Sequence, residues 1–134
     1  MKNRSELREI IMKILYQTYI YEEAKIDYKI EELIKEQLEV ENQFVDETIA
    51  GVRKNQKKIN ELANKYLIDW TIDRLSKVDQ AILSLGIYEL MYTDTPSVVS
   101  INEAIELSKK YSEDSVSKML NGVLDKIYHE EIKD

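Results

Sequence analysis

The amino-acid sequence predicts an all-α protein of about seven helices. Apolar residues recur at spacings of three and four along most of the chain, which is the pattern of helices that bury one face. No segment alternates apolar and polar residues for long enough to predict a strand. The 134 residues include only three Gly and one Pro, so there is little material for tight turns. This length predicts one domain with a substantial core.

The stretch from Val78 to Tyr92 is the element around which the other helices are expected to pack. Apolar and aromatic side chains cover most of its circumference on a 3.6-residue period, which is typical of a helix inside a protein. It is too short to span a bilayer. Ser76 and Asp79 have the spacing of an N-cap and its acidic partner, so the helix is expected to begin there.

The first helix is expected to begin after Asn3, with Glu6 completing a capping box. Its core stripe consists of Leu7, Ile10, Ile11, Ile14, Leu15 and Thr18. The pattern then puts Arg8, Met12 and Tyr16 in one row on an exposed flank, close to other cations. Cations beside an aromatic ring suit single-stranded nucleic acid, because they hold phosphates while the ring stacks on a base. The alternative is a solvated flank with a half-buried tyrosine.

Helices are also expected at about residues 27–39 and 43–54, and from residue 56 onward. Gly51 lies inside the second of these, where it costs about 1 kcal/mol relative to Ala, and it predicts close approach of a neighbouring helix. Asn55 is the expected cap of the helix that follows it.

Residues 67–77 form the expected connection into the central helix, held by three apolar residues: Trp70, Ile72 and Leu75. Ser100 and Glu103 form a second capping-box pattern, which predicts the start of the sixth helix. The seventh helix has a clean apolar stripe that ends at Ile127, and the charged tail after Tyr128 is expected to fray.

The net charge of −7 at first disfavours nucleic acid as a partner. The charge is unevenly spread, however: residues 1–13 carry a local +2, residues 14–50 a local −7 and residues 51–67 a local +4. Separate patches matter more to a polyanion than the sum does. The basic group around residues 53–58 either extends a phosphate-binding surface or complements the end of the third helix, and we favour the second interpretation.

The residue types that catalysis requires are missing or isolated. There is no Cys, and the one histidine, His129, lies in the charged tail. Gly51, Gly86 and Gly122 stand alone within helices and form no phosphate-binding loop. The glutamates of the second helix lack the loop spacing of a calcium site. We expect no enzyme, no metal, no cofactor, no membrane segment and no signal peptide, which together favour a cytoplasmic setting.

Several separated motifs occur in order along the chain. The longest is W-x-x-D-R-L-x-x-V-D-x-A-I-L-x-L-x-I-Y-E-L, from Trp70 to Leu90. It is followed in order by P-x-x-V-x-I-N-E-A-I-E-L at 96–107 and N-G-V-L-D-K-I at 121–127. Near the N-terminus, R-E-x-x-x-x-x-L-Y at 8–16 and A-G-V at 50–52 also fit. Together these motifs resemble the NusB family of bacterial transcription antitermination factors, and the resemblance covers essentially the whole chain.

The resemblance implies two packed helical subdomains, at about residues 1–54 and 55–134. It implies binding of boxA RNA together with the ribosomal protein NusE, and entry into the RNA polymerase elongation complex with other Nus factors, notably on ribosomal RNA operons. The RNA-binding residues carried over by position are Lys2, Arg4, Arg8, Tyr16, Asp79, Lys118 and Met119.

An alternative function is a protein-only helical adaptor that keeps the fold without recognising RNA. Ser5 and Glu6 interrupt the basic N-terminal segment, and the whole chain is acidic. The two functions differ in salt dependence, because neutralising phosphates makes affinity fall steeply as salt rises.

Overall fold

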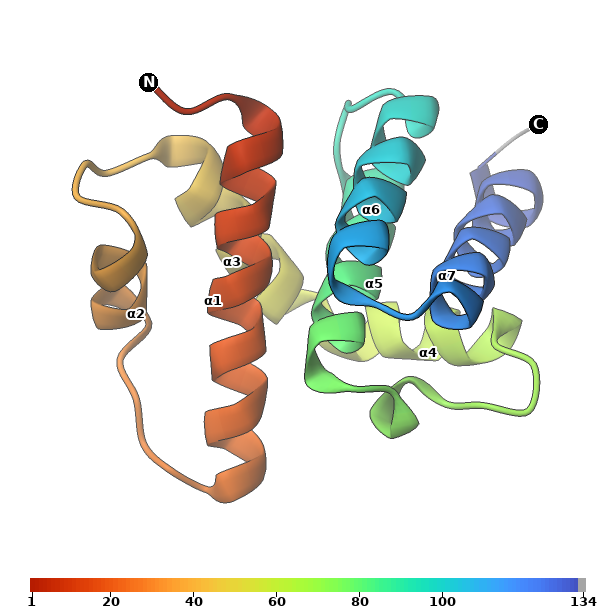
Figure 1. The fold of residues 1–134 in the computed structure, drawn as a ribbon, viewed down its shortest axis with the longest axis horizontal. Coiled ribbons are helices and arrows are strands. Elements are labelled where there is room, and N and C mark those ends of the chain that lie inside the picture. The colour runs from red at the N-terminus through yellow and green to blue at the C-terminus, as the bar shows by residue number, and fades with distance from the viewer. Residues whose placement is uncertain (133–134) are drawn as a thin grey trace.

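The computed structural model describes residues 1–132 and, within them, contains helices and no strand (Figure 1). The prediction of an all-α fold with seven main helices is therefore confirmed. They are α1 (Arg4–Ala24), α2 (Ile30–Gln37), α3 (Gln43–Lys54), α4 (Gln56–Tyr66), α5 (Lys77–Tyr92), α6 (Ser97–Tyr111) and α7 (Asp114–Ile127). Two short turns complete the order: η1 (Ile72–Arg74), of 3-10 type, before α5, and η2 (Tyr128–Ile132), a π-helical turn, after α7.

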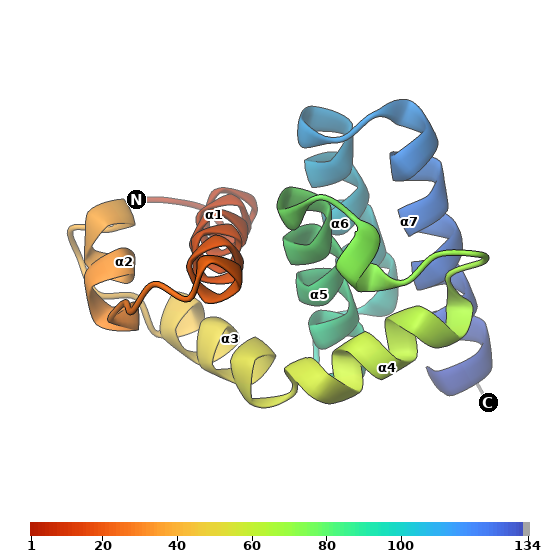
Figure 2. The ribbon, with the colours of Figure 1, turned by 90° about the horizontal axis from the view of Figure 1, so that it is seen from below.

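The long helix α1 lies between two groups of helices. It packs against α2 and α3 on one side and against α5 on the other (Figures 1 and 2). Its start is the predicted capping box, in which the Asn3 side chain accepts from the Glu6 amide and the Glu6 side chain accepts from the Asn3 amide. Because both neighbours cover it, α1 buries more of its circumference than one apolar stripe would.

The central helix α5 is buried as predicted. Ten of its 16 residues are buried, and it contacts α1, α3, α4, α6 and α7. Ser76 caps its first turn by accepting from the Asp79 amide at 3.1 Å. On the side facing α6 and α7, a Cβ atom at Gly86 would lie 3.2 Å from Ala104 and Leu124, so the helices meet closely there.

Gly51 has the role that its position predicted, since it allows close approach of α5 to α3. A Cβ atom there would lie 2.2 Å from the hydroxyl of Tyr88 on α5. The next helix begins at Gln56, after a break at Asn55. Asn55 occupies the N-cap position, but its side-chain amide donates to the Gly51 carbonyl at 2.8 Å and does not cap α4. The break coincides with the expected subdomain border at residues 54/55, and the border itself stays a prediction.

Two predictions about helix ends were wrong. The second helix spans only Ile30–Gln37, shorter than the expected residues 27–39, because no side chain caps its start. The sixth helix begins at Ser97 after Pro96, one turn before the expected start. Ser100 is consequently buried inside α6, and Glu103 is free to interact with α1.

One prediction about the connection into α5 was also wrong in part. Ile72 and Leu75 are buried in the segment before α5, but Trp70 is 42% exposed, and the Arg74 guanidinium lies over its ring at 4.6 Å. Through Ile132 the tail continues as the turn η2, in which Glu131 accepts hydrogen bonds from Lys65 at 2.8 Å and from the Tyr66 hydroxyl. The fraying of the tail stays a prediction, and its residues 133–134 lie outside the described residues.

Candidate nucleic-acid interface

The exposed cations among the predicted RNA-binding residues lie at the starts of two helices. Lys2 and Arg4 are exposed at the beginning of α1, and Lys118 is exposed in the early part of α7. The Arg4 guanidinium lies 3.9 Å from the centre of the Phe44 ring on α3. Such cation–π contact holds the side chain in place while its charge still faces solvent. No sequence signal linked Phe44 to Arg4.

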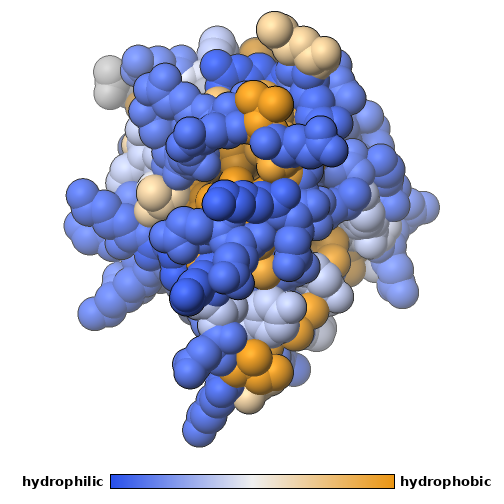
Figure 3. Space-filling model, turned by 90° about the vertical axis from the view of Figure 1, so that its left-hand side faces the viewer, coloured by the Kyte–Doolittle hydropathy of each residue, from blue (hydrophilic) through white to orange (hydrophobic). Residues whose placement is uncertain are grey.

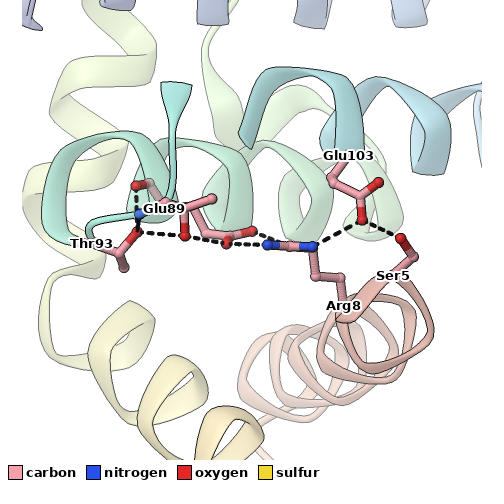
Figure 4. Close-up of polar contacts among 6 residues, drawn as sticks. Ser5, Arg8, Glu89, Thr93 and Glu103 are labelled. Atoms are coloured by element: carbon pink, nitrogen blue, oxygen red, sulfur yellow. Dashed lines mark hydrogen bonds and ion pairs between the residues drawn. The ribbon is translucent and has the colours of Figure 1, made fainter. Parts of the chain in front are cut away.

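Arg8 is not on an exposed flank, and that prediction was wrong. It is only 6% exposed, and it bridges α1 to α5 and α6 (Figure 4). Its Nε and Nη2 atoms donate to the two carboxylate oxygens of Glu89 at 2.7 and 3.0 Å, and its Nη1 donates to Glu103 at 2.9 Å. Glu103 also accepts from the Ser5 hydroxyl, and Thr95 donates to Glu89 at 3.3 Å.

Each of the three guanidinium nitrogens of Arg8 thus donates to a carboxylate. Burial by itself lowers the pKa of Arg8, but the hydrogen bonds and charges of Glu89 and Glu103 outweigh that effect, and the net pKa is raised. A side chain held in this way has little free surface for a phosphate. The geometry gives Arg8 the job of positioning α1, which carries the exposed cations Lys2 and Arg4 at its start.

The other two residues of the expected exposed flank are also covered. Met12 is buried and Tyr16 is half-buried against the core. The ion pairs Arg8–Glu89 and Lys77–Glu23 show that α1 and α5 run antiparallel, and we call the contact between them the α1–α5 seam. One apolar stripe predicts one covered face, whereas α1 is covered on two sides.

Between the ion pairs at its two ends, the seam contains uncharged polar side chains that also reach α4. The Tyr19 hydroxyl donates to the Gln56 side chain at 2.6 Å, and the Gln56 amide donates to the buried Ser84 hydroxyl at 3.1 Å. Burial raises the pKa of Tyr19 to about 12, so this hydroxyl stays a donor at neutral pH. The sequence contained no signal for this cluster.

Asp79 is also largely internal, at 8% exposure. Its carboxylate accepts from the Ser76 hydroxyl at 2.8 Å and from the Ser112 hydroxyl in the turn between α6 and α7. Asp79 therefore fixes that turn against the start of α5. Met119 is half-buried on α7, next to the exposed Lys118. The RNA-binding roles of all seven residues stay predictions.

Besides the contacts of Ser5 and Arg8 with Glu103, another link joins α1 to α6 at the surface. Lys110 donates to both carboxylate oxygens of Glu9 at 2.8 and 2.9 Å, and the Tyr111 hydroxyl donates to the same group. Hydrogen bonds from Lys110 and then from Tyr111 lower the pKa of Glu9. Within residues 1–132, no group of three or more His, Asp or Glu side chains is placed to hold a metal. Over the same residues, no helix has the length and apolar character needed to cross a membrane.

Comparisons of the sequence agree over nearly the whole chain. A sequence model of the NusB family matches residues 5–129. The transcription antitermination protein NusB of Pediococcus pentosaceus is 37% identical over 128 residues, which cover 93% of this chain and 96% of that protein. The protein of the same name from Clostridium perfringens is 36% identical over 132 residues, which cover 94% and 96%.

Comparisons of the structure lead to the same proteins. NusB of T. maritima superposes with a TM-score of 0.82 at 34% identity, covering 98% of this chain and 94% of that one. A crystal structure of the antitermination factors NusB and NusE in complex with double-stranded RNA contains a chain that superposes with a TM-score of 0.79 at 25% identity. That match covers 94% of this chain and 96% of the other.

Proposed function

The chain belongs to the NusB family, and on that premise we propose that it is a transcription antitermination factor that binds RNA together with NusE. The RNA is a boxA-type single strand in nascent transcripts, notably those of ribosomal RNA operons. The complex joins elongating RNA polymerase with other Nus factors. The protein works in the cytoplasm by binding and catalyses no reaction.

The observation that carries this proposal is the full-length likeness to a NusB chain that was solved with NusE and RNA. The exposed cations of this chain support it. Lys2 and Arg4 at the start of α1 and Lys118 on α7 have charges open to solvent, as phosphate contacts require. We assign base contacts to Tyr16 and Met119, which are half-buried and keep part of their surface free.

Arg8 and Asp79 have a different role in this proposal. Both are buried and already hydrogen-bonded, so they hold the elements that carry the contacts. Arg8 fixes α1 against α5 and α6, and Asp79 fixes the α6–α7 turn against α5.

A protein-only adaptor is the second candidate, and one observation favours it. The net charge is −7, and Arg8, one of the four basic groups in residues 1–13, is neutralised by two carboxylates. A long-range repulsion therefore opposes RNA, and it has to be overcome by a few local contacts and by the partner.

The experiment that separates the two is a titration of labelled boxA RNA followed by fluorescence anisotropy, with and without NusE and beside a scrambled RNA. An RNA-binding factor prefers boxA and binds it more tightly with NusE. Three phosphate contacts predict a log–log salt slope of about −2, from about −0.7 for each contact. Equal weak binding of both RNAs with a flat salt response supports the adaptor.

A pair of variants on α7 sharpens this test. Lys118→Ala removes a proposed phosphate contact and should make the slope shallower by about 0.7. Lys126→Ala removes an exposed cation near the other end of the same helix and should leave the slope unchanged. Equal effects of the two variants would mean that only overall charge matters and that Lys118 makes no specific contact.

A further inference from the structure

A groove of about 490 Å³ lies between α2 and α3, on the side of the molecule away from α6 and α7. Figure 3 views the molecule from this α2 side, where hydrophobic side chains are visible between hydrophilic ones. The apolar lining of the groove consists of Ile30 and Ile34 in α2, Leu38 at the C-terminal end of α2, and Ile49 and Ala50 in α3. The volume falls within the range of about 300–1,000 Å³ that is usual for ligand sites.

The groove is open because α2 is poorly covered. It has eight residues and packs on α1, and Leu33 is its one buried residue. Three apolar residues around it, Ile30, Ile34 and Leu38, are only half-buried. A short helix with an incompletely buried apolar face gains stability when a partner covers that face.

The charge around the groove indicates which kind of partner fits. Four acidic residues line it, namely Glu31, Glu39, Glu41 and Asp46, against two basic ones, Lys35 and Arg53, which leaves a local charge of −2. Residues 14–50 as a whole carry −7. This field repels RNA and attracts cationic groups, so a protein partner is favoured over a nucleic acid.

We propose that the α2–α3 groove is a docking surface for a segment of a partner protein that presents aliphatic side chains flanked by Lys and Arg. An amphipathic helix has this form, with its apolar anchors entering the groove and its cations meeting the acidic rim. The docking follows from the groove alone and does not depend on RNA binding.

The position of the groove adds a consequence that does rest on the proposed function. Leu38, Glu39 and Glu41 also line a second hollow, of about 920 Å³, that reaches Lys2 and Arg4. A segment that reaches the Leu38 and Glu41 end of the groove is therefore close to the cationic start of α1. Its own Lys and Arg residues would neutralise the acidic face next to the RNA, and boxA affinity should rise when the segment is bound.

The first test uses a probe peptide of twelve residues that forms a helix, with Leu at positions 1, 5 and 8 and Lys on both flanks. Its control has Glu in place of every Lys. Amide chemical shifts of the full-length protein are recorded during each titration. We expect shifts concentrated in α2 and α3 for the Lys peptide and at least tenfold weaker binding of the Glu peptide. Shifts scattered over all acidic surfaces, or equal binding of both peptides, would overturn the proposal.

Matched variants keep the result independent of general charge attraction. Ala50 is exposed on α3, so Ala50→Trp fills the groove without disturbing the core and should weaken the Lys peptide at least tenfold. Ser115→Trp adds the same ring at an exposed position on α7 and should change nothing. Unchanged binding to Ala50→Trp would place the peptide elsewhere and refute the groove as its site.

Two further measurements test the other possible occupants of the groove, which are RNA and a second copy of this chain. If boxA RNA alone shifts the α2–α3 amides and Ala50→Trp weakens RNA binding, the groove is a nucleic-acid site and the proposal fails. If sedimentation shows self-association that Ala50→Trp abolishes, a second copy fills the groove and the proposal also fails. Loss of peptide binding with intact boxA binding would reject only the docking surface, and the reverse result would reject only the proposed function.

Discussion

The two sides of α5 are both buried, but different forces hold them. On the side of α6 and α7, apolar atoms meet closely, and Gly86 allows Leu124 to approach. On the side of α1 and α4, polar groups meet: Glu89 binds Arg8 at 2.7 Å, and Ser84 accepts from Gln56 at 3.1 Å. The first side gains stability from area removed from water, and the second depends on every polar group keeping its partner.

This difference determines how each side fails. Removing carbon atoms from the apolar side leaves a cavity, and the cost grows with its volume. Removing one partner from the polar side leaves a buried charge, which is costly whatever the volume. In the α1–α5 seam, removing both members of a pair should therefore cost less stability than the sum of the two single removals. On the apolar side, a second truncation should not recover the loss caused by the first.

Arg8→Met is expected to have the largest effect. It leaves Glu89, 2% exposed, without its cation, and breaking a buried pair in this way costs about 3–5 kcal/mol. The double variant Arg8→Met/Glu89→Met removes both charges and should recover most of that loss. Urea unfolding of the four proteins in the cycle measures the coupling. Additive losses would show that the two side chains do not stabilise the fold as a pair.

Leu83→Ala tests the apolar helix itself. Leu83 is fully buried, so its truncation should reduce the free energy of unfolding by about 2–5 kcal/mol. Thermal or urea unfolding provides the measurement. Ile34→Ala on the open groove is the matched control and should cost clearly less, because Ile34 is only half-buried. A near-neutral Leu83→Ala would contradict the central position of α5.

The same contrast explains what could be predicted from the sequence. Apolar spacing located α5, and polar residue types located the caps at Asn3 and Ser76, because each depends on neighbouring residues in the chain. Gly51 predicted a close approach, but not that its neighbour would be Tyr88 on α5. The same apolar spacing failed to show that Arg8 is buried, because its partner Glu89 is 81 positions away in the chain. Charge and spacing in one helix do not reveal whether a second helix covers that flank.

The candidate site shows the same limit. Lys2, Arg4 and Lys118 were predicted as RNA contacts, and the structure shows all three open to solvent, as phosphate contacts require. Asp79 was assigned by likeness, but its carboxylate is bound to the hydroxyls of Ser76 and Ser112. A capping signal was visible for Ser76, whereas the link to Ser112 depends on how α6 and α7 return to α5.

Replacing Gly51 or Gly122 by alanine should change the stability less, and in opposite directions. In Gly51→Ala the new Cβ would lie 2.2 Å from the Tyr88 hydroxyl, so the ring has to move at a cost of about 1–3 kcal/mol, offset by about 1 kcal/mol of helix propensity. A Cβ atom at Gly122 would have no atom within 4 Å apart from its chain neighbours and the backbone of its own helix, and Gly122→Ala should stabilise by about 0.5–1 kcal/mol. Thermal unfolding of the two variants compares them. Equal stabilisation would mean that α3 and α5 do not meet through Gly51.

The smallest effect is expected at the surface link between α1 and α6. Hydrogen bonds from Lys110 and Tyr111 lower the pKa of Glu9, so the folded state favours the charged carboxylate. This stabilisation is fully present above the usual glutamate pKa of about 4.5 and is lost as the pH falls through the lower pKa of the folded state. Lys110 is well exposed, so solvent screening keeps the effect small.

Glu9→Gln should therefore lower the melting temperature at pH 7 by at most about 4 °C and have a smaller effect below pH 4. Thermal unfolding from pH 3 to pH 7 measures this difference. Glu106→Gln is the control, because its carboxylate faces only Lys109 on its own helix at 3.6 Å, and it should give a nearly constant difference. A Glu9→Gln loss that does not shrink with acid would mean that Glu9 stabilises the α1–α6 contact through packing, in the manner of the apolar side of α5.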